Sequence, residues 1–168
     1  MANTLRGVYG TDVLIAAANS FTGSVLQADY TKKMAVSMIM PNGLMAYRRT
    51  MTGAELKETL RAFVEGCAGG FVPFNRSSLP VASGITMEVK EAGGSYTLTG
   101  ITRNGQPLRE DDTVTVTCLA TTKQMTAVFA DESRTVTDEG TWVKDAWRDY
   151  VSGGGAALAE PENYMTLR

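Results

Sequence analysis

The pattern of apolar and polar positions along the chain predicts several short strands. Residues 12–18 form a compact apolar run, which is typical of a strand buried on both faces. Apolar and polar residues alternate at 85–90, which indicates a strand with one buried face. The same pattern predicts a strand at 96–102, and alternating threonine and valine predict another at 113–117.

Turn-forming residues separate these strands. Pro41-Asn42-Gly43 lies between two apolar stretches, residues 33–40 and 44–51, and an Asn-Gly pair in this setting predicts a β-hairpin. Gly93-Gly94 and Asn104-Gly105 predict two further turns, because glycine and asparagine tolerate the left-handed backbone that tight turns require. Most neighbouring strands are therefore expected to run antiparallel.

Helical spacing is clear in two segments. Thr52 and Glu55 form a Thr-x-x-Glu capping box, and the apolar stripe that follows predicts a helix at about 53–65. A second apolar stripe predicts a helix at about 141–152, which Thr141 could cap. The expected fold is α+β, with mixed, largely antiparallel sheet layers packed with two principal helices.

Length and composition indicate one globular domain covering residues 1–168. The chain has 168 residues, of which 43% are hydrophobic and 20% charged. The net charge is −2 and the basic residues form no stripe, which argues against a nucleic-acid partner. No apolar run reaches membrane-spanning length, so we expect no membrane partner. Residues 1–6 lack the apolar segment of a signal peptide, so we expect either a cytoplasmic protein or a piece of a longer exported chain.

The chain has no histidine, and this restricts its chemistry most. Without histidine, Ser-His-Asp and Cys-His catalysis and the histidine-rich dimetal sites of most metallophosphatases are excluded. Catalysis by carboxylates or lysine stays open. Cys67 and Cys118 are too few for a metal site on their own, and spacing alone assigns no disulfide. We expect both to be ordinary buried or half-buried thiols.

An ordered set of stretches resembles one known family. The strand and loop, the helix start and three later segments follow the family's order and cover most of residues 9–152. They are Thr11–Asn19, Thr52–Leu60, Pro80–Ile85, Asn104–Leu108 and Thr113–Val116. This set resembles the C-terminal domain of 5'-nucleotidases and related periplasmic nucleotide and UDP-sugar hydrolases.

The resemblance implies a division of labour between two domains. In the family, the C-terminal domain grips the base and sugar of a nucleotide and turns it toward an N-terminal metallophosphatase domain, which holds two metal ions. We therefore expect a nucleotide or nucleoside-like small molecule as ligand and a metallophosphatase domain, absent from this chain, as partner. This chain would be inactive alone and hold no cofactor of its own, with divalent metal ions only in the absent domain. Family members are usually exported, which implies a periplasmic, cell-wall or extracellular location.

The sequence departs from the family where the ligand binds. The family's loop after the first strand carries an arginine that helps to hold phosphate, whereas residues 19–24 contain none and only Asn19 carries over. Residues 119–128 also lack the family's aromatic ring and Gly-Gly-Asp. Stacking of an aromatic ring on a base contributes about 1 to 3 kcal/mol, so its loss would weaken nucleotide binding. For this reason an alternative function stays open. The alternative is a diverged, non-catalytic binding or docking module that has lost nucleotide recognition.

Six residues are candidates for ligand binding. Phe71, Phe74 and Asn75 lie in one glycine-flanked loop and could rebuild an aromatic clamp, although phenylalanines that only anchor the loop are the simpler interpretation. Lys123 stands where the family's lost motif was and could offer a positive charge, although a solvated surface lysine is the simpler interpretation. The full set is Asn19, Phe71, Phe74, Asn75, Ser83 and Lys123, with no catalytic or metal-binding residue among them.

Overall fold

A computed structural model describes residues 1–17, 20–21, 37–39, 44–66, 79–120, 141–153 and 164–167. These parts contain three α-helices and a π-helical turn: α1 (Ala2–Tyr9), α3 (Gly53–Arg61), α5 (Val143–Ser152) and η2 (Ala62–Gly66). They also contain nine strands: β1 (Val13–Ala17), β2 (Met45–Thr52), β3 (Pro80–Ser83), β4 (Thr86–Ala92), β5 (Ser95–Arg103), β6 (Gln106–Pro107), β7 (Thr113–Ala120), β8 (Thr141–Trp142) and β9 (Met165–Leu167).

The strands form two sheets. The five-stranded sheet has the order β3-β1-β7-β2-β8, and the four-stranded sheet has the order β6-β5-β4-β9. Only β1·β7 and β4·β9 are parallel pairs among the described strands; the other pairs are antiparallel. This confirms the predicted α+β fold with mixed, largely antiparallel sheets.

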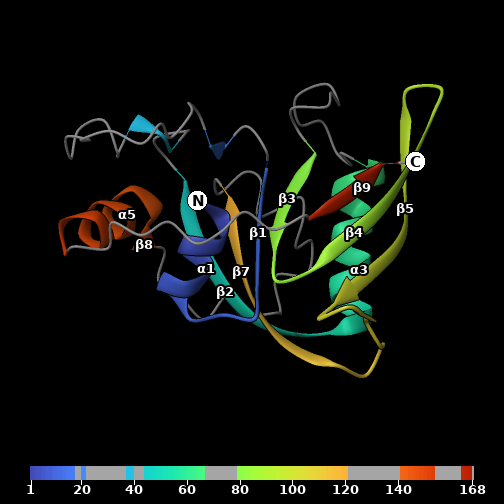
Figure 1. Cartoon of the computed structure of the whole chain (residues 1–168), viewed down its shortest axis with the longest axis horizontal. Coiled ribbons are helices and arrows are strands. Elements are labelled where there is room, and N and C mark those ends of the chain that lie inside the picture. Colours follow the sequence, from blue (N-terminus) through green and yellow to red (C-terminus); the bar gives the residue numbers. More distant parts are fainter. Residues whose placement is uncertain are drawn as a thin grey trace.

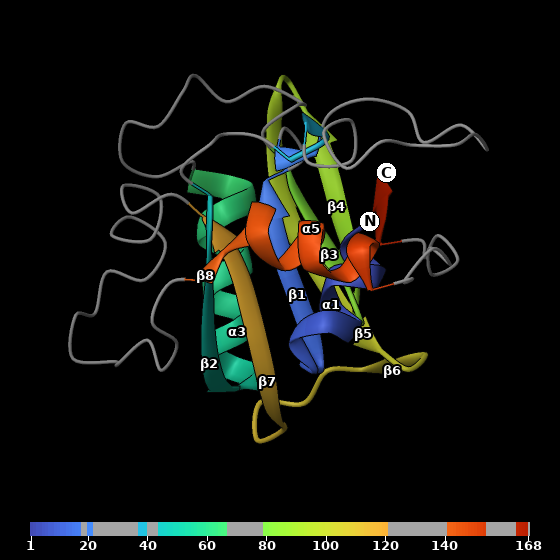
Figure 2. The ribbon, with the colours of Figure 1, turned by 90° about the vertical axis from the view of Figure 1, so that its left-hand side faces the viewer.

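Helices and sheets stack in layers around the five-stranded sheet. Figure 1 shows α1 and α5 on one side of this sheet, and α3 with the four-stranded sheet on the other. Figure 2, seen from the side of α5, shows α5 and α1 lying across the strands. Because side chains alternate along a strand, Leu14 and Ala16 of β1 face α1 and α5, whereas Val13 and Ile15 face the α3 side. β1, in the interior of the five-stranded sheet, is therefore buried on both faces.

The start of α3 follows from its sequence. The backbone N–H of Glu55 donates to the Thr52 hydroxyl at 3.2 Å, and the Glu55 carboxylate accepts from the Thr52 N–H at 2.8 Å, which confirms the predicted capping box. Gly53 follows this cap directly, and a Cβ atom there would lie 1.8 Å from the carbonyl oxygen of Arg109. The first turn of α3 therefore docks closely against the loop before β7.

The structure differs from the predicted local structure in three places. Both predicted helices are present, as α3 and α5, but residues 2–9 also form a helix, α1, which ends at Gly10 in a left-handed conformation. A helix of two turns is too short for its spacing to stand out in the sequence, and Leu5 is its one large buried side chain. The helix predicted at 141–152 begins at Val143, and its N-cap residue is Trp142, which makes no side-chain cap.

The third difference concerns the hairpin predicted around Asn42-Gly43, whose turn lies outside the described residues. Of its predicted first strand, residues 33–40, the structure describes only 37–39, and there Ile39 forms an isolated bridge with Phe21. The described partners of β2 are β7 along its whole length and β8 at its start. Asn-Gly favours a tight turn, but it does not determine which strand the following segment pairs with.

Candidate functional site

Four strands bring their ends together at one edge of the five-stranded sheet. Ala17 and Ala120 are the last residues of the parallel strands β1 and β7. Met45, the first residue of β2, pairs with Ala120, and Pro80, the first residue of β3, pairs with Ala17. We call this edge, defined by these four residues, the carboxyl edge. It lies at the top of the sheet in Figure 1.

Five of the six predicted binding residues belong to segments that join the described structure at the carboxyl edge. Asn19 follows β1 by two residues, and Lys123 follows β7 by three. Phe71, Phe74 and Asn75 precede β3. All five lie outside the described residues, so their positions stay predictions. Their place in the sequence nevertheless connects them to the same edge through three different strands.

Ser83, the sixth predicted residue, lies elsewhere. It pairs with Leu14 at the far end of β3, three residues along β1 from Ala17, which is about 10 Å at the rise of a strand. Its side chain is fully buried (0% exposed). The buried Ser83 therefore has no surface of its own to present to a ligand.

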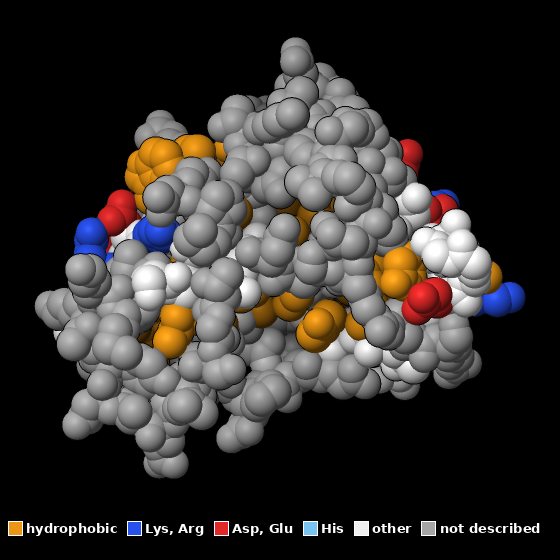
Figure 3. Space-filling view, turned by 90° about the horizontal axis from the view of Figure 1, so that it is seen from above, with side chains coloured by type: hydrophobic (Ala, Val, Ile, Leu, Met, Phe, Trp, Pro, Cys, Tyr) orange, Lys and Arg blue, Asp and Glu red, His pale blue; other side chains and the backbone are white. Residues whose placement is uncertain are grey.

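Apolar and sulfur-containing side chains line the described part of the carboxyl edge. Trp142 of β8 pairs with Met45, and the Tyr47 hydroxyl lies 3.6 Å from the Met45 sulfur, to which it donates. Trp142 is 48% exposed, which makes it one of two large hydrophobic residues exposed in the described part. Figure 3 looks onto this side of the molecule and shows hydrophobic side chains at several places on it. An exposed aromatic ring therefore lies at the edge to which the predicted residues connect.

Trp142 was not among the residues predicted to bind a ligand. The available signal was its position at the start of the predicted second helix, off the apolar stripe that contains Trp147. Part of the loop after β1, in which Asn19 was predicted to bind a ligand, packs on the core instead of facing the solvent. Ser20 is buried and Phe21 packs against the core on the α1 side, so this part of the loop anchors to the fold.

The opposite edge of the sheet carries a cluster of polar side chains around Asp12. The backbone N–H and the hydroxyl of Thr115 both donate to Asp12 Oδ2 at 2.8 Å, and Arg103 donates to Oδ1 at 2.6 Å. The backbone N–H of Thr115, then its hydroxyl and the charges of Arg103 and Arg6, hold the pKa of Asp12 below its usual value, against the opposing effect of burial. Asp12 is therefore ionised at neutral pH. Its carboxylate, which directly precedes β1, bonds to Thr115 of β7 and to Arg103 of β5, and so links the two sheets.

The described residues offer no metal site and one inert thiol. No group of three or more His, Cys, Asp or Glu residues that could hold a metal ion occurs in the described ranges. Cys118 is buried and unbridged, and burial raises the pKa of its thiol to about 12, which confirms the prediction of an ordinary buried thiol. Cys67 lies outside the described residues.

None of the helices in the described ranges is both long enough and apolar enough to cross a membrane.

The architecture matches that of a domain of 5'-nucleotidases. A 5'-nucleotidase precursor from Thermus thermophilus has a TM-score of 0.72 at 15% identity, over 99% of this chain and 34% of that one. The Haemophilus influenzae NAD nucleotidase has a TM-score of 0.66 at 17% identity, over 99% and 32%. The sulfate thiohydrolase of Thermus thermophilus has a TM-score of 0.68 at 12% identity, over 98% and 30%.

These matches confirm the resemblance at the level of the fold. The chain spans about a third of the length of each of these proteins, and this fits the C-terminal domain that the sequence motifs indicated. No protein-family model and no curated protein sequence matches the chain.

Proposed function

We propose that this chain is the substrate-recognition domain of a 5'-nucleotidase-type phosphoester hydrolase and that it does not catalyse alone. The observation that carries the proposal is the convergence of four strand ends at the carboxyl edge of a fold shared with solved 5'-nucleotidases. Binding residues commonly lie in loops positioned by a rigid scaffold, and the predicted residues belong to segments attached to this edge.

The chemistry of the described part of the edge suits recognition better than hydrolysis. Trp142 offers an exposed aromatic face, on which a base could stack with about 1 to 3 kcal/mol of stabilisation. Ala17, Met45 and Ala120, which define the edge with Pro80, carry no ionisable group that could act as a general acid or base. We expect hydrolysis to depend on a separate metallophosphatase domain with its own metal ions, as the family resemblance implies. The matched proteins are about three times longer than the region aligned with this chain, which leaves room for such a domain.

A titration of the purified chain with adenosine, AMP and UDP-glucose tests this function. The two tryptophans differ in setting: Trp142 is exposed at the carboxyl edge, whereas Trp147 is 3% exposed and stacks on Tyr150. We expect micromolar to low-millimolar binding by calorimetry, accompanied by a change in Trp142 fluorescence. The Trp142→Phe variant keeps an aromatic ring and should bind with the fluorescence change lost.

Three results would contradict the proposal. One is the absence of binding by all three ligands at millimolar concentration. Another is release of phosphate from AMP by this chain alone in a single-turnover assay, because the chain would then catalyse without a second domain. If binding is seen but the fluorescence change persists in Trp142→Phe, the ligand site lies away from the carboxyl edge, which also counts against the proposal.

The second candidate function is a diverged binding or docking module. Two observations favour it: residues 119–128 lack the family's aromatic ring and Gly-Gly-Asp, and the same fold occurs in a sulfate thiohydrolase. The fold is thus not restricted to proteins named as nucleotidases. If the folded chain binds none of the three ligands in the titration above, the result supports this second function.

A further inference from the structure

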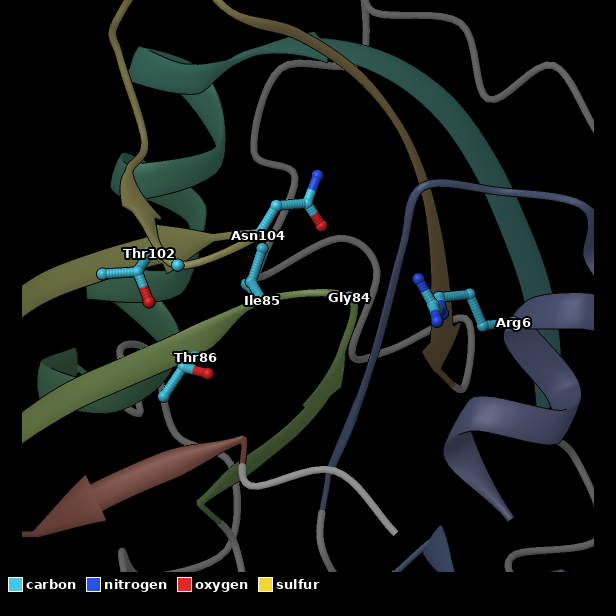
Figure 4. Close-up of a pocket in the computed structure, with 7 residues that line it drawn as sticks. Arg6, Gly84, Ile85, Thr86, Thr102 and Asn104 are labelled. Carbon is cyan, nitrogen blue, oxygen red and sulfur yellow. The ribbon is translucent and has the colours of Figure 1, made fainter. Parts of the chain in front are cut away.

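A cavity opens beside the Asp12 cluster, at the opposite end of the five-stranded sheet from the carboxyl edge. Its volume is about 340 Å³, and it lies between α1 and the four-stranded sheet. Figure 4 shows the guanidinium group of Arg6 reaching from α1 toward Gly84, with Thr86, Thr102 and Asn104 across the gap. The cavity thus lies between side chains from separate layers of the fold.

The polar groups that line this cavity are rich in hydrogen-bond donors. Thr86 and Thr102 are directly paired across β4 and β5, so their side chains project from the same face of the sheet. Asn104 follows Thr102 by two residues, in the turn before β6, and has a carboxamide that can donate twice. Together with Arg6, these side chains surround the cavity with a guanidinium group, an amide and two hydroxyls.

The local charge is positive. Arg6 and Arg103 carry two positive charges, against one negative charge on Asp12, whose carboxylate Arg103 binds at 2.6 Å. None of the described residues that line the cavity is acidic. Arg6 is held in place by its bond to the Asp12 carbonyl oxygen at 3.2 Å, so its charge is positioned in advance. Pre-positioned donors of this kind favour an oxyanion over a cation or an apolar ligand.

We propose that this cavity binds a phosphate group, held by the Arg6 guanidinium together with Thr86, Thr102 and Asn104. A phosphate group presents oxygens in several directions, which fits donors that come from α1, β4, β5 and a turn. The phosphate could be inorganic phosphate or the terminal group of a small phosphomonoester, and the cavity admits either. The site is distinct from the carboxyl edge, and the proposal does not depend on the function proposed above.

Amide NMR of the isotope-labelled chain tests the proposal. Inorganic phosphate and glycerol 3-phosphate are titrated in parallel to about 20 mM, a range suited to millimolar dissociation constants, with sodium chloride as the ionic-strength control. The amides of Gly84, Thr86 and Gly105 are the reporters because these residues line the cavity. We expect saturable shifts at these amides with phosphate and none with chloride. If the two ligands bind with equal affinity, we identify the ligand of the cavity as inorganic phosphate. If glycerol 3-phosphate binds more tightly, we identify it as a phosphomonoester.

Variants separate binding from folding. Asn104→Gly removes the carboxamide but suits the backbone, because Asn104 has φ +53° and glycine adopts this conformation freely. Thr86→Val with Thr102→Val removes two hydroxyls and keeps the shape and strand preference of both residues. Asn104→Gly is expected to weaken phosphate binding about tenfold, the typical effect of losing a hydrogen bond to a charged group, and the double threonine variant, which loses two, about a hundredfold. The control Thr97→Val lies on β5 away from the cavity and should bind as the wild type does.

Arg6→Gln should abolish phosphate binding, but Arg6 also supports the fold through its bond to Asp12. The test of the proposal therefore depends on Asn104→Gly and the double threonine variant. The proposal is overturned if neither anion shifts the three reporter amides, or if chloride shifts them equally. It is also overturned if Asn104→Gly and the double threonine variant both bind phosphate with wild-type affinity.

Discussion

Gly84 lies between β3 and β4, where the chain passes from the five-stranded to the four-stranded sheet. Its φ is +87°, a conformation that residues with a side chain rarely adopt. A Cβ atom at this position would lie 2.1 Å from the carbonyl oxygen of Asp12 and 2.9 Å from Nη1 of Arg6. Gly84→Ala therefore adds backbone strain and also pushes against the junction of the two sheets.

The expected cost is the sum of two effects. The left-handed backbone costs an alanine about 1 to 2 kcal/mol relative to glycine. A Cβ atom at 2.1 Å must move by more than 1 Å to reach ordinary contact, and overpacking of this kind costs about 1 to 3 kcal/mol. We therefore expect Gly84→Ala to lower the free energy of unfolding by about 3 kcal/mol. At this chain length that corresponds to a decrease in Tm of roughly 6 to 12 °C.

Gly94→Ala is the matched control. Gly94 has a similar φ of +80°, but a Cβ atom there would meet nothing within 4 Å. Its alanine variant should lose only the backbone contribution, which is roughly 2 to 8 °C in Tm. Thermal unfolding of the wild type and both variants, followed by circular dichroism in one buffer, gives the comparison. Equal losses of Tm in the two variants would refute the reasoning, because the contact with Asp12 would then cost nothing.

Three further predictions concern the cap, the Asp12 cluster and the buried thiol. Thr52→Ala removes the cap of α3 and should lower stability by about 1 kcal/mol in denaturant unfolding, whereas Thr52→Ser should restore most of it. Asp12→Asn should lower stability at pH 7 by about 1 to 2 kcal/mol, a moderate value because the carboxylate is 36% exposed. Since the folded pKa of Asp12 lies below 3.8, its contribution is complete above the unfolded pKa and is lost as pH falls through the folded pKa. The difference in Tm between wild type and Asp12→Asn should therefore shrink below about pH 4, and a constant difference down to pH 2 would contradict this. In a Cys67→Ser background, Cys118 should react with a thiol reagent only after unfolding, because burial raises its pKa to about 12; rapid labelling of the native chain would contradict its burial.

Local signals in the sequence predicted the elements that short-range chemistry controls. The capping box at Thr52 and Glu55 and the glycine turns at 93–94 and 104–105 occur where the sequence placed them. α1 was missed because two helical turns with one large buried side chain produce too weak a periodicity. β9 was missed because a three-residue strand depends on its partner β4 rather than on its own pattern.

Long-range pairing could not be derived from local patterns. The Thr11 hydroxyl lies 3.1 Å from that of Thr117, and Asp12 binds Thr115, although about a hundred residues separate each pair in the chain. These contacts fix the parallel pairing of β1 with β7, and with it the carboxyl edge. The order of the family motifs indicated that these segments belong to one domain, but not which strands pair. The exposed ring of Trp142 at that edge emerged only from the register of β8 against β2.

The most direct test of the central claim is an amide NMR titration of the chain with adenosine. Adenosine carries no phosphate, so it probes the carboxyl edge without engaging the cavity beside Arg6. We expect saturable shifts at Ala17, Met45, Ala120 and Trp142, with Gly84 and Gly105 unchanged. Absence of saturable shifts at the carboxyl edge, or shifts confined to the opposite end of the sheet, would contradict the assignment of this domain to substrate recognition.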